Sequence, residues 1–305
     1  MSEAIYAAIE GGGTKFVCAL GHCAERILER VVLPTRDPAA TLASVLDFIQ
    51  AAQARHGAIR AVGIACFGPL DLRYGSQTFG KLMATPKPGW SGTDLVGPLQ
   101  ERLRVPVRID TDVGAAALAE LKLGAARDVG SVAYVTVGTG IGGGFAPTTW
   151  NGATLLHPEM GHLLVRRDPR DPDFPGICPF HRDCLEGLAS GPAIQARWQA
   201  DLSELGEAHV ATSIIANYLG QLATSIALLA SPQRIVFGGG VLTAGHLLTH
   251  VRSSAHQWLN GYVAPLYFAA DFDRYIVGSG LGTEAGLAGA FLLAAEAERV
   301  TRPAQ

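Results

Sequence analysis

The stretch IYAAIEGGGTKFVCAL, residues 5–20, decides the fold, because two apolar runs flank three consecutive glycines. Residues 132–146, VAYVTVGTGIGGGFA, repeat this pattern, and residues 234–242, RIVFGGGVL, repeat its first half. In the first two stretches an apolar run follows the glycines, which predicts a β-hairpin rather than a strand that leads into a helix. A glycine-rich turn lets backbone N–H groups approach phosphate oxygens closely. One such turn is ordinary hairpin chemistry, but three in one chain indicate a phosphorylated ligand.

Helical segments separate these turns. Residues 41–57 end at a glycine and carry apolar side chains along one face, namely Leu42, Val45, Ile49 and Ala52. A second helix is expected to begin near Asp112 and run to Gly124, and a last one to open at Thr283 and continue to the C-terminus. Because a hairpin followed by helices and strands occurs twice, the sequence predicts two similar α/β halves with a cleft between them.

Composition narrows the class of protein. The chain has 305 residues, which is enough for two domains, and its 48% hydrophobic content excludes a disordered protein. A formal charge of −3 leaves no basic surface for nucleic acid. The N-terminus has no cationic segment ahead of an apolar one, and five cysteines make an odd count, so we expect a cytoplasmic protein without a disulfide framework.

The segment between Val210 and Arg234 carries no charged side chain and is long enough to span a bilayer. Polar residues are spread through it, and its larger aliphatic residues recur at spacings of four and three: Ile215, Leu219, Leu222, Ile226 and Leu229. This spacing predicts the buried stripe of a core helix, so no membrane partner is expected.

Two familiar nucleotide motifs are matched only superficially. Residues 75–81, GSQTFGK, resemble a Walker A loop, but Leu82 stands where a hydroxyl should hold Mg²⁺. Gly138, Gly140 and Gly143 satisfy the spacing of a dinucleotide-binding fingerprint, yet FAPTTWNG follows them and cannot begin the required helix. We reject both interpretations.

A group of histidines and cysteines predicts a metal site. His162 precedes the run CPFHRDC, which contributes Cys178, His181 and Cys184. Two thiolates and two imidazoles suit tetrahedral Zn²⁺, and four protein ligands leave no open position, so the ion would be structural. It would hold the loop at 166–177, whose DPRDPDFPG composition is not expected to pack by itself. His157 is a second candidate for the fourth ligand.

Taken together, these motifs resemble the ROK family of sugar kinases, and within it the bacterial fructokinase branch. The resemblance runs from IEGGGTKFVCAL through FGPLDL, TPKPGW and DTDVGAAALAE to IVFGGGV, and LLHPEMGH combined with CPFHRDCLEGLASGPAI is its most specific part. It implies the actin-like ATPase fold, which is ribonuclease H-like and has two α/β domains flanking a cleft for ATP and sugar. We expect residues 1–114 as the first domain, completed by the C-terminal helix at about 290–305, and residues 115–289 as the second.

The resemblance also assigns residue roles. Contacts to Mg²⁺-ATP fall on Gly11, Gly12, Thr14, Lys15, Gly138, Thr139, Gly140, Pro192, Gly238, Gly239 and Gly240. Contacts to the sugar fall on Gly68, Glu159 and His162. Asp112 matches the catalytic aspartate, and the zinc ligands are His162, Cys178, His181 and Cys184.

Chemistry agrees with the role of Asp112. Phosphoryl transfer needs a carboxylate that accepts the proton of the attacking hydroxyl, and Asp112 at a helix start is placed to project into a cleft. A simple helix N-cap is the alternative reading of Asp112, and Asp110 is a second candidate for the base. Glu10 is expected to orient a water on Mg²⁺. Relatives often have Asn where this chain has Gly114, which removes one sugar or cap contact.

The expected reaction is therefore ATP-dependent phosphorylation of fructose to fructose 6-phosphate by a homodimer. The alternatives are kinases for mannose, glucose or an N-acetylated amino sugar, although the CPFH form of the zinc loop argues against the glucose branch. Repressors of the same family carry an N-terminal winged helix, for which we expect no room before the glycine turn that follows Glu10. A sugar-binding regulator without catalysis is expected to lack Asp112, which is present.

Overall fold

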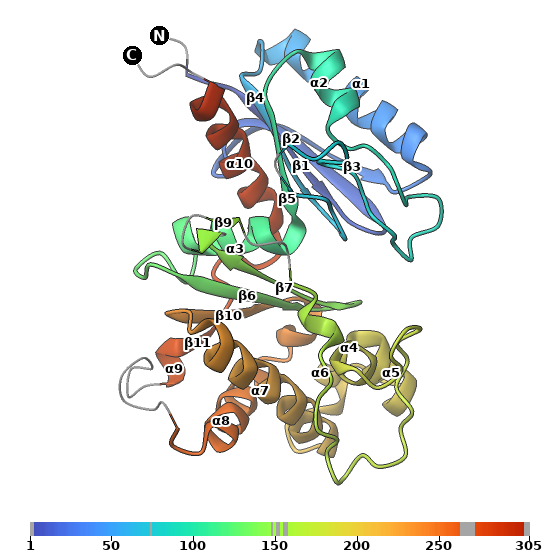
Figure 1. The fold of residues 1–305 in the computed structure, drawn as a ribbon, viewed down its shortest axis with the longest axis vertical. Helices are drawn as coiled ribbons and strands as arrows, with labels where there is room; N and C mark the ends of the chain where they lie inside the picture. Colours follow the sequence, from blue (N-terminus) through green and yellow to red (C-terminus); the bar gives the residue numbers. More distant parts are fainter. Residues whose placement is uncertain are drawn as a thin grey trace. The chain divides into compact units, whose positions relative to one another are not determined.

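The computed structural model describes residues 3–73, 75–147, 149–150, 153–154, 158–262 and 272–301. The chain forms two compact units (Figure 1). The first comprises Met1–Ala119, Thr148–His157 and Glu284–Gln305, and the second comprises Glu120–Pro147 and Pro158–Thr283. The division falls inside helix α3 (Asp112–Lys122), slightly later in that helix than the expected boundary at 114–115.

A five-stranded sheet forms the centre of the first unit, in the order β3-β2-β1-β4-β5. Its strands are β1 (Tyr6–Gly11), β2 (Lys15–Cys23), β3 (Arg26–Pro34), β4 (Ala61–Cys66) and β5 (Val107–Thr111). β1 pairs antiparallel with β2 across the glycine turn, which confirms the first predicted hairpin, and pairs parallel with β4. The glycine turn therefore lies at the end of the sheet where the parallel strands β1, β4 and β5 finish.

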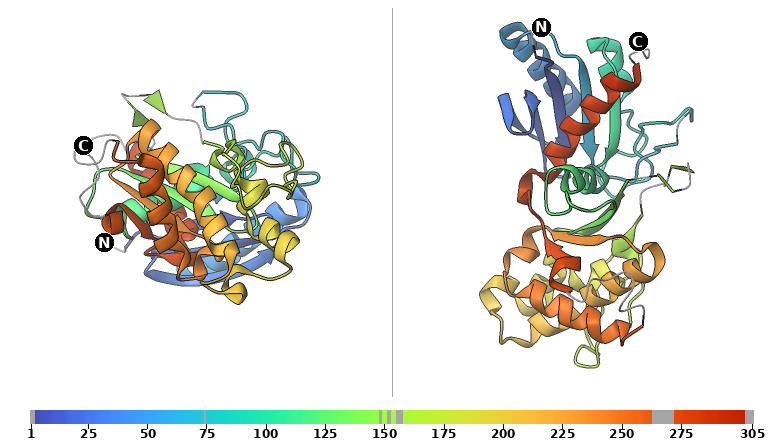
Figure 2. Two further views of the ribbon diagram at one scale, coloured as in Figure 1. Left: turned by 90° about the horizontal axis from the view of Figure 1, so that it is seen from below. Right: turned by 90° about the vertical axis from the view of Figure 1, so that its left-hand side faces the viewer.

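Helices α1 (Pro38–His56), α2 (Gly97–Leu103), α3 and α10 (Ala285–Thr301) complete the first unit. Gly57, with a φ of 109°, ends α1 as the sequence predicts, whereas the helix begins three residues before the expected start, where the side chain of Asp37 caps it. α10, red in Figure 2, packs against β1, β4 and β5. This packing is very close, because a Cβ on Gly63 would lie 1.8 Å from the carbonyl oxygen of Ala290.

The second unit contains a four-stranded sheet in the order β11-β10-β6-β7. Its strands are β6 (Val132–Val137), β7 (Ile141–Ala146), β10 (Arg234–Gly238) and β11 (Ile276–Gly278). β6 and β7 are antiparallel, which confirms the second predicted hairpin, and β10 runs parallel to β6. The short strands β8 (Thr149–Trp150) and β9 (Ala153–Thr154), which belong to the first unit, pair with each other.

Helical segments of very different length make up most of the rest of the second unit. The α-helices are α4 (Leu185–Ala189), α5 (Gly191–Trp198), α6 (Leu202–Leu205), α7 (Val210–Ala230), α8 (Leu247–Leu259) and α9 (Phe272–Tyr275). The 3₁₀ turns are η1 (Met160–His162), η2 (Gly240–Thr243) and η3 (Gly282–Glu284). α7 packs along α8 and also contacts α4 and α6.

Helix α7 is the uncharged segment singled out in the sequence. By length and composition it could cross a membrane, but 61% of its most apolar window is buried inside the chain. The predicted stripe is buried at Ile215, Leu219, Leu222 and Ile226. The prediction is wrong for Leu229, which is 78% exposed, because only one side of the last turn is covered: Ala227 is buried there, whereas Leu228 and Leu229 are exposed.

Candidate functional site

The first glycine turn, between β1 and β2, is braced from several sides. The N–H of Gly12 donates to the carbonyl of Lys15 at 2.8 Å, which closes the turn. The carbonyl of Gly11 accepts from the N–H of Phe67 at 2.9 Å, and that of Gly12 accepts from the hydroxyl of Thr35 at 2.8 Å. Gly68 follows Phe67 directly, so the predicted sugar-binding residue of the first unit adjoins this turn.

The glycines of the turn serve different purposes. A Cβ on Gly11 would lie 2.8 Å from the sulfur of Cys66, so packing inside the unit requires glycine there. A Cβ on Gly13 would meet nothing within 4 Å, and its φ is not positive. Neither packing nor backbone conformation requires glycine at position 13. The missing side chain leaves room for a molecule outside the chain.

Two carboxylates lie near this turn. Glu10 precedes it in β1, and Asp112 opens helix α3. Burial, followed by the negative charges of Asp112 and Glu284, raises the pKa of Glu10 to about 7. A Cβ on Gly286, near the start of α10, would lie 2.4 Å from the carboxylate of Glu10, so this side chain fills a confined space. Two half-buried carboxylates that repel each other form a favourable site for a divalent cation such as Mg²⁺.

Asp110 occupies the space beside Asp112. Its carboxylate accepts from the N–H of Thr111 at 2.7 Å, and a Cβ on Gly114 would lie 2.5 Å from it. The asparagine that relatives often carry at position 114 would therefore collide with Asp110 in this chain. The Asp112 carboxylate itself accepts from the N–H of Val113 at 2.9 Å, in the first turn of α3.

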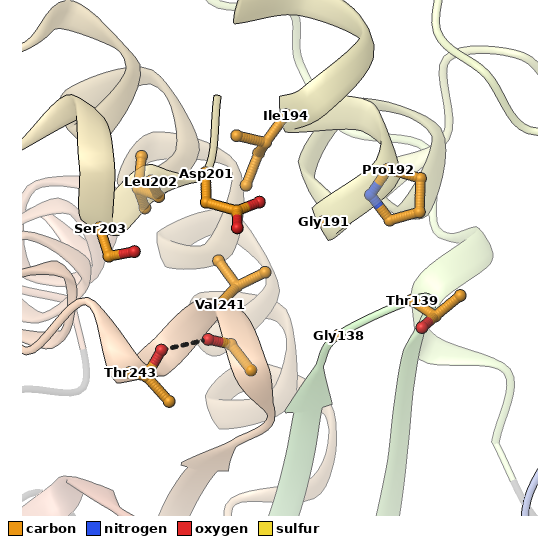
Figure 3. Close-up of a pocket in the computed structure, with 11 residues that line it drawn as sticks. Gly138, Thr139, Gly191, Pro192, Ile194, Asp201, Leu202, Ser203, Val241 and Thr243 are labelled. Atoms are coloured by element: carbon orange, nitrogen blue, oxygen red, sulfur yellow. Dashed lines mark hydrogen bonds between the residues drawn. The ribbon is translucent and has the colours of Figure 1, made fainter. Parts of the chain in front are cut away.

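The second unit contains a cavity of about 390 Å³ where the turn between β6 and β7 meets the starts of α5, α6 and η2 (Figure 3). It brings together four predicted nucleotide residues, Gly138, Thr139, Pro192 and Gly240. The other lining residues are Gly191, Ile194, Asp201, Leu202, Ser203, Val241 and Thr243. The cavity has the polar glycine turns on one side and aliphatic side chains on the other, which suits a nucleoside with its phosphates.

Of the three consecutive glycines at 238–240, only Gly240 leaves open space in this cavity. Gly239 has a φ of 92°, and a Cβ there would lie 2.4 Å from the carbonyl oxygen of Val137. A Cβ on Gly238 would lie 2.5 Å from the hydroxyl of Tyr134. These two glycines are required by close packing within the unit, whereas a Cβ on Gly240 would meet nothing within 4 Å.

Sequence reasoning missed the part of the cavity that α6 contributes. Asp201, Leu202 and Ser203 lie outside every glycine motif. The available signal was the pair Asp201 and Glu204, because the N–H of Asp201 donates to the Glu204 carboxylate at 2.9 Å in a capping box. The capping box predicts a helix start at this position, but not its place beside the glycine turns.

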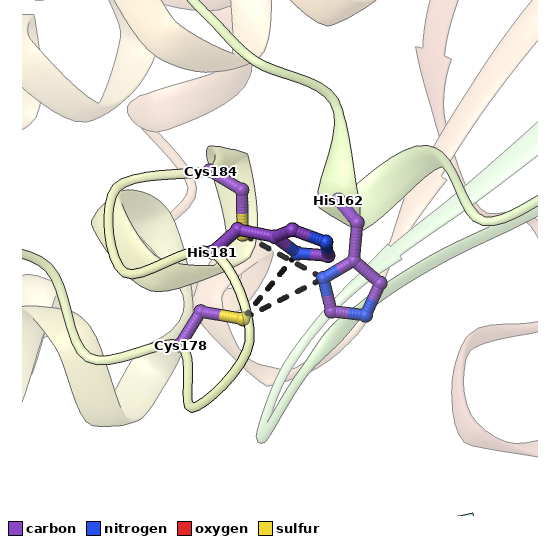
Figure 4. A group of neighbouring side chains, drawn as sticks. All are labelled: His162, Cys178, His181 and Cys184. Atoms are coloured by element: carbon purple, nitrogen blue, oxygen red, sulfur yellow. Dashed lines mark hydrogen bonds between the residues drawn. The ribbon is translucent and has the colours of Figure 1, made fainter. Parts of the chain in front are cut away.

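The four predicted zinc ligands meet in the second unit (Figure 4). Their ligand atoms all lie within 4.8 Å of one another. The sulfur of Cys178 is 3.7 Å from Nδ1 of His162 and 3.8 Å from Nδ1 of His181, and the sulfur of Cys184 is 3.6 Å from Nδ1 of His162. Tetrahedral Zn²⁺ with bonds of about 2.3 Å to sulfur and about 2.0 Å to nitrogen gives sulfur–nitrogen separations of about 3.6 Å. The cluster therefore fits the ion. His157, the second candidate for the fourth ligand, lies outside the described residues.

A bound cation would change the protonation of this cluster. Burial raises the pKa of the Cys184 thiol to about 11, so without a cation this thiol stays protonated at neutral pH. A bound divalent ion would stabilise the thiolate and release the proton.

The turn η1 carries His162 and is packed tightly against β7. A Cβ on Gly161 would lie 2.0 Å from the carbonyl oxygen of Ile141, and Met160 is buried against Gly143. The carbonyl of Glu159 accepts from the N–H of His162 at 3.1 Å. Glu159 is therefore held between strand β7 and the cysteine–histidine cluster.

Glu186 connects the zinc loop to the second glycine turn. It lies in α4, directly after the cluster, and its carboxylate accepts from the N–H of Ile141 at 2.9 Å. A Cβ on Gly140 would lie 2.7 Å from the same carboxylate, so Gly140 is required by this contact. Sequence reasoning quoted Glu186 within a motif but gave it no role.

The loop at 166–177 has an anchor that does not involve the cluster. Asp168 and Asp171 are both 1% exposed. Asp171 forms an ion pair with Arg197 of α5 and accepts from the hydroxyl of Tyr218 at 2.8 Å. Hydrogen bonds from Arg170 hold the pKa of Asp168 below its usual value. The expectation that this loop needs the metal in order to pack is therefore wrong in part, because a buried ion pair attaches it to α5 and hydrogen bonds from Asn217 and Tyr218 attach it to α7.

The predicted site residues thus divide between the two units. Those in the first unit are Gly11, Gly12, Thr14, Lys15, Gly68 and Asp112. Those in the second unit are Gly138, Thr139, Gly140, Glu159, His162, Cys178, His181, Cys184, Pro192, Gly238, Gly239 and Gly240.

Comparisons of the sequence and of the structure with known proteins indicate the same protein family. Residues 6–297 match the family model described as the ROK family. The chain is 44% identical over 297 residues to a fructokinase of Zymomonas mobilis, covering 96% of this chain and 97% of the relative. Its structure is similar to a ROK hexokinase from Thermus thermophilus, with 28% identity, a TM-score of 0.75 and coverage of 97% and 99% of the two chains. It is also similar to a ROK family glucokinase from Streptomyces griseus in complex with glucose and AMPPNP, with 26% identity, a TM-score of 0.70 and coverage of 96% and 100%. These similarities confirm the expected actin-like ATPase fold.

Proposed function

Because the chain belongs to the ROK family, we propose that it is a hexose kinase that uses ATP to phosphorylate fructose at its 6-hydroxyl, giving fructose 6-phosphate. The observation that carries this proposal is the identity to a fructokinase over nearly the whole chain. That identity is well above the identities to the hexokinase and the glucokinase.

Asp112 is the proposed general base. A carboxylate at the start of α3 accepts the proton of the sugar hydroxyl as that oxygen attacks the terminal phosphorus of ATP. Glu10 is the proposed partner of Mg²⁺, through a water on the ion, and bound Mg²⁺ would neutralise charge on the phosphates. The raised pKa of Glu10 supports this role, because a nearby cation would favour its ionised form.

The nucleotide is proposed to bind with its nucleoside in the cavity of the second unit. Thr139, Pro192 and Gly240 line this cavity, and the open space at Gly240 supports a close approach of the ligand. Gly140 is proposed to act in the same turn, while Gly238 and Gly239 shape the run that leads to Gly240. Gly11, Gly12, Thr14 and Lys15 are the proposed phosphate contacts of the first unit.

The sugar is proposed to contact Gly68, Glu159 and His162. A carboxylate accepts strongly from adjacent sugar hydroxyls, which supports Glu159 as the main contact. Structural Zn²⁺ on His162, Cys178, His181 and Cys184 is proposed to keep Glu159 in place, and the fit of the four ligand atoms supports this. With no open coordination position, the ion takes no part in the reaction.

The proposed enzyme is a cytoplasmic homodimer whose partners are the sugar and ATP, without a nucleic acid or membrane partner. The burial of α7 supports the last point.

The experiment that tests the proposed activity follows ADP release with purified protein, fructose and Mg²⁺-ATP, and identifies the product by NMR. The Asp112→Asn variant is the matched control, because it keeps the size of the side chain and removes the base. Fructose-dependent ADP release that is lost in the variant is the expected result. Absence of ADP release with every hexose would refute the proposal.

A further inference from the structure

The motif TPKPGW, residues 85–90, is held firmly against the first glycine turn, although the proposed mechanism gives it no role. Trp90 is fully buried. Its ring stacks on Phe16 at 5.6 Å and meets the edge of Phe67 at 5.4 Å, and its Nε1–H donates to the carbonyl of Arg36 at 3.0 Å. Phe16 lies in β2 directly after the glycine turn, so Trp90 fixes this loop beside that turn.

Lys87 extends from this anchored loop to the glycine turn. The carbonyl of Lys87 accepts from the N–H of Trp90 at 3.2 Å, so the lysine opens a tight turn that the buried indole closes. The ammonium group of Lys87 donates to the carbonyl of Gly13. A cation from a segment 74 residues away in sequence is thereby placed at the middle of the first glycine turn.

This contact has a consequence for the backbone of the turn. The carbonyl of Gly12 accepts from the hydroxyl of Thr35, and the carbonyl of Gly13 accepts from Lys87. In a trans peptide the C=O and N–H groups point in opposite directions, so fixing these carbonyls also fixes the N–H groups of Gly13 and Thr14. Those two N–H groups donate to no acceptor within the described part of the chain.

Adjacent N–H groups that are fixed and unused form an anion-binding concavity. The open space at Gly13, where a Cβ would meet nothing, lies at the same turn. Glu10 directly precedes the turn, and the charge of Asp112 acts on Glu10. An anion held here therefore lies near the proposed base, which is where the transferred phosphoryl group of ATP must be.

We propose that Lys87 is a positioning residue for phosphoryl transfer, which holds the carbonyl of Gly13 so that the N–H groups of Gly13 and Thr14 bind the terminal phosphate of ATP. Its positive charge also favours that phosphate. This inference rests on the proposed use of ATP, but not on the identity of the sugar.

The test compares the variants Lys87→Met and Lys87→Arg with the unchanged protein. Dissociation constants for AMPPNP and ADP are measured by calorimetry with Mg²⁺, and kcat/KM for ATP is measured at saturating sugar. Lys81→Met is the matched control, because Lys81 lies in the same long loop and no hydrogen bond of its ammonium is among those described. Thermal unfolding checks that each variant is folded.

Lys87→Met should weaken AMPPNP binding about tenfold and ADP binding less than about threefold, because ADP lacks the terminal phosphate. The value of kcat/KM for ATP should fall at least about tenfold, Lys87→Arg should recover most of the loss, and Lys81→Met should behave like the unchanged protein. Thr35→Val removes the hydrogen bond to the carbonyl of Gly12. This variant should also weaken AMPPNP binding more than ADP binding, and it replaces Lys87→Met in the test if Lys87→Met does not fold.

A purely structural role for Lys87 predicts a different result, namely that AMPPNP and ADP are weakened equally or not at all. Either outcome would overturn the inference even if the protein phosphorylates fructose. If no hexose is phosphorylated but the preferential loss for AMPPNP is observed, the proposed reaction fails. The role of Lys87 in binding the terminal phosphate of the nucleotide then stands.

Discussion

Replacing Glu10 by glutamine tests whether this buried side chain carries the raised pKa that its surroundings impose. Burial is the main cause, followed by the charges of Asp112 and Glu284, and the pKa rises from 4.5 to about 7. The folded chain therefore binds more protons than the unfolded chain between these two values, and stability falls as the pH rises through this window. The full shift corresponds to about 3 kcal/mol above pH 7, because each pKa unit is worth about 1.4 kcal/mol.

Glutamine has the size of glutamate and no charge, so Glu10→Gln removes this penalty. The variant should be more stable than the unchanged protein by about 2–3 kcal/mol at pH 8, and by much less at pH 5. For a unit of this size the difference corresponds to a rise in Tm of roughly 5–10 °C at pH 8. The assay is thermal unfolding in EDTA at both pH values, with Glu101→Gln on the exposed side of α2 as the control.

Millimolar Mg²⁺ should stabilise the unchanged protein at pH 8 more than it stabilises Glu10→Gln, because the ionised carboxylate attracts the cation. Equal stability of the two proteins at pH 8 in EDTA would show that Glu10 carries no unfavourable charge. The interpretation of Glu10 and Asp112 as a cation-binding pair would then be wrong.

Three further variants test the other parts of the site. Asp112→Asn should lower kcat by ~10²–10⁴-fold with little change in the Kd for AMPPNP, and retention of more than about a tenth of the activity would exclude Asp112 as the base. Cys184→Ala should lose about one zinc per chain in metal analysis and lower Tm. Its loop at 166–177 should nevertheless resist proteolysis, because the ion pairs of Asp168 and Asp171 remain, and rapid cleavage there would contradict this account. Glu159→Gln should raise KM for fructose about tenfold or more and KM for ATP less than about twofold, so an equal rise in both would argue against a sugar contact.

Local patterns predicted much of the fold. The glycine turns flanked by apolar runs predicted both hairpins, and the capped, periodic segment that became α1 was predicted almost to its ends. These elements depend on neighbouring residues, so a short window of sequence contains the whole signal. The four ligands of the cluster were predicted for a similar reason, because three of them lie within one short run.

Contacts between distant segments could not be predicted. Lys87 and Gly13, and likewise Glu186 and Ile141, are far apart in sequence and follow no periodicity. Burial at the end of α7 depends on which elements cover it, so Leu229 fits the helical stripe and is still exposed.

The segment that resembles a Walker A loop has a different explanation in the structure. The hydroxyls of Ser76 and Thr78 donate to the buried carboxylate of Asp71 at 2.7 and 2.6 Å. Hydrogen bonds from Arg73 to the same carboxylate hold the pKa of Asp71 well below its usual value. The polar residues of this segment therefore order a loop of the first unit, which agrees with rejecting the motif.

The central claim, that the preferred substrate is fructose, is tested most directly by kcat/KM for fructose, glucose, mannose and N-acetylmannosamine under identical Mg²⁺-ATP. Glu159 is exposed in the structure, but a bound sugar would cover its carboxylate. A wrong sugar would then leave this carboxylate covered and unsatisfied, so discrimination should be large. We predict that kcat/KM for fructose exceeds each of the others by about tenfold or more. A value for glucose or the amino sugar that exceeds fructose by about tenfold would contradict the account of the substrate.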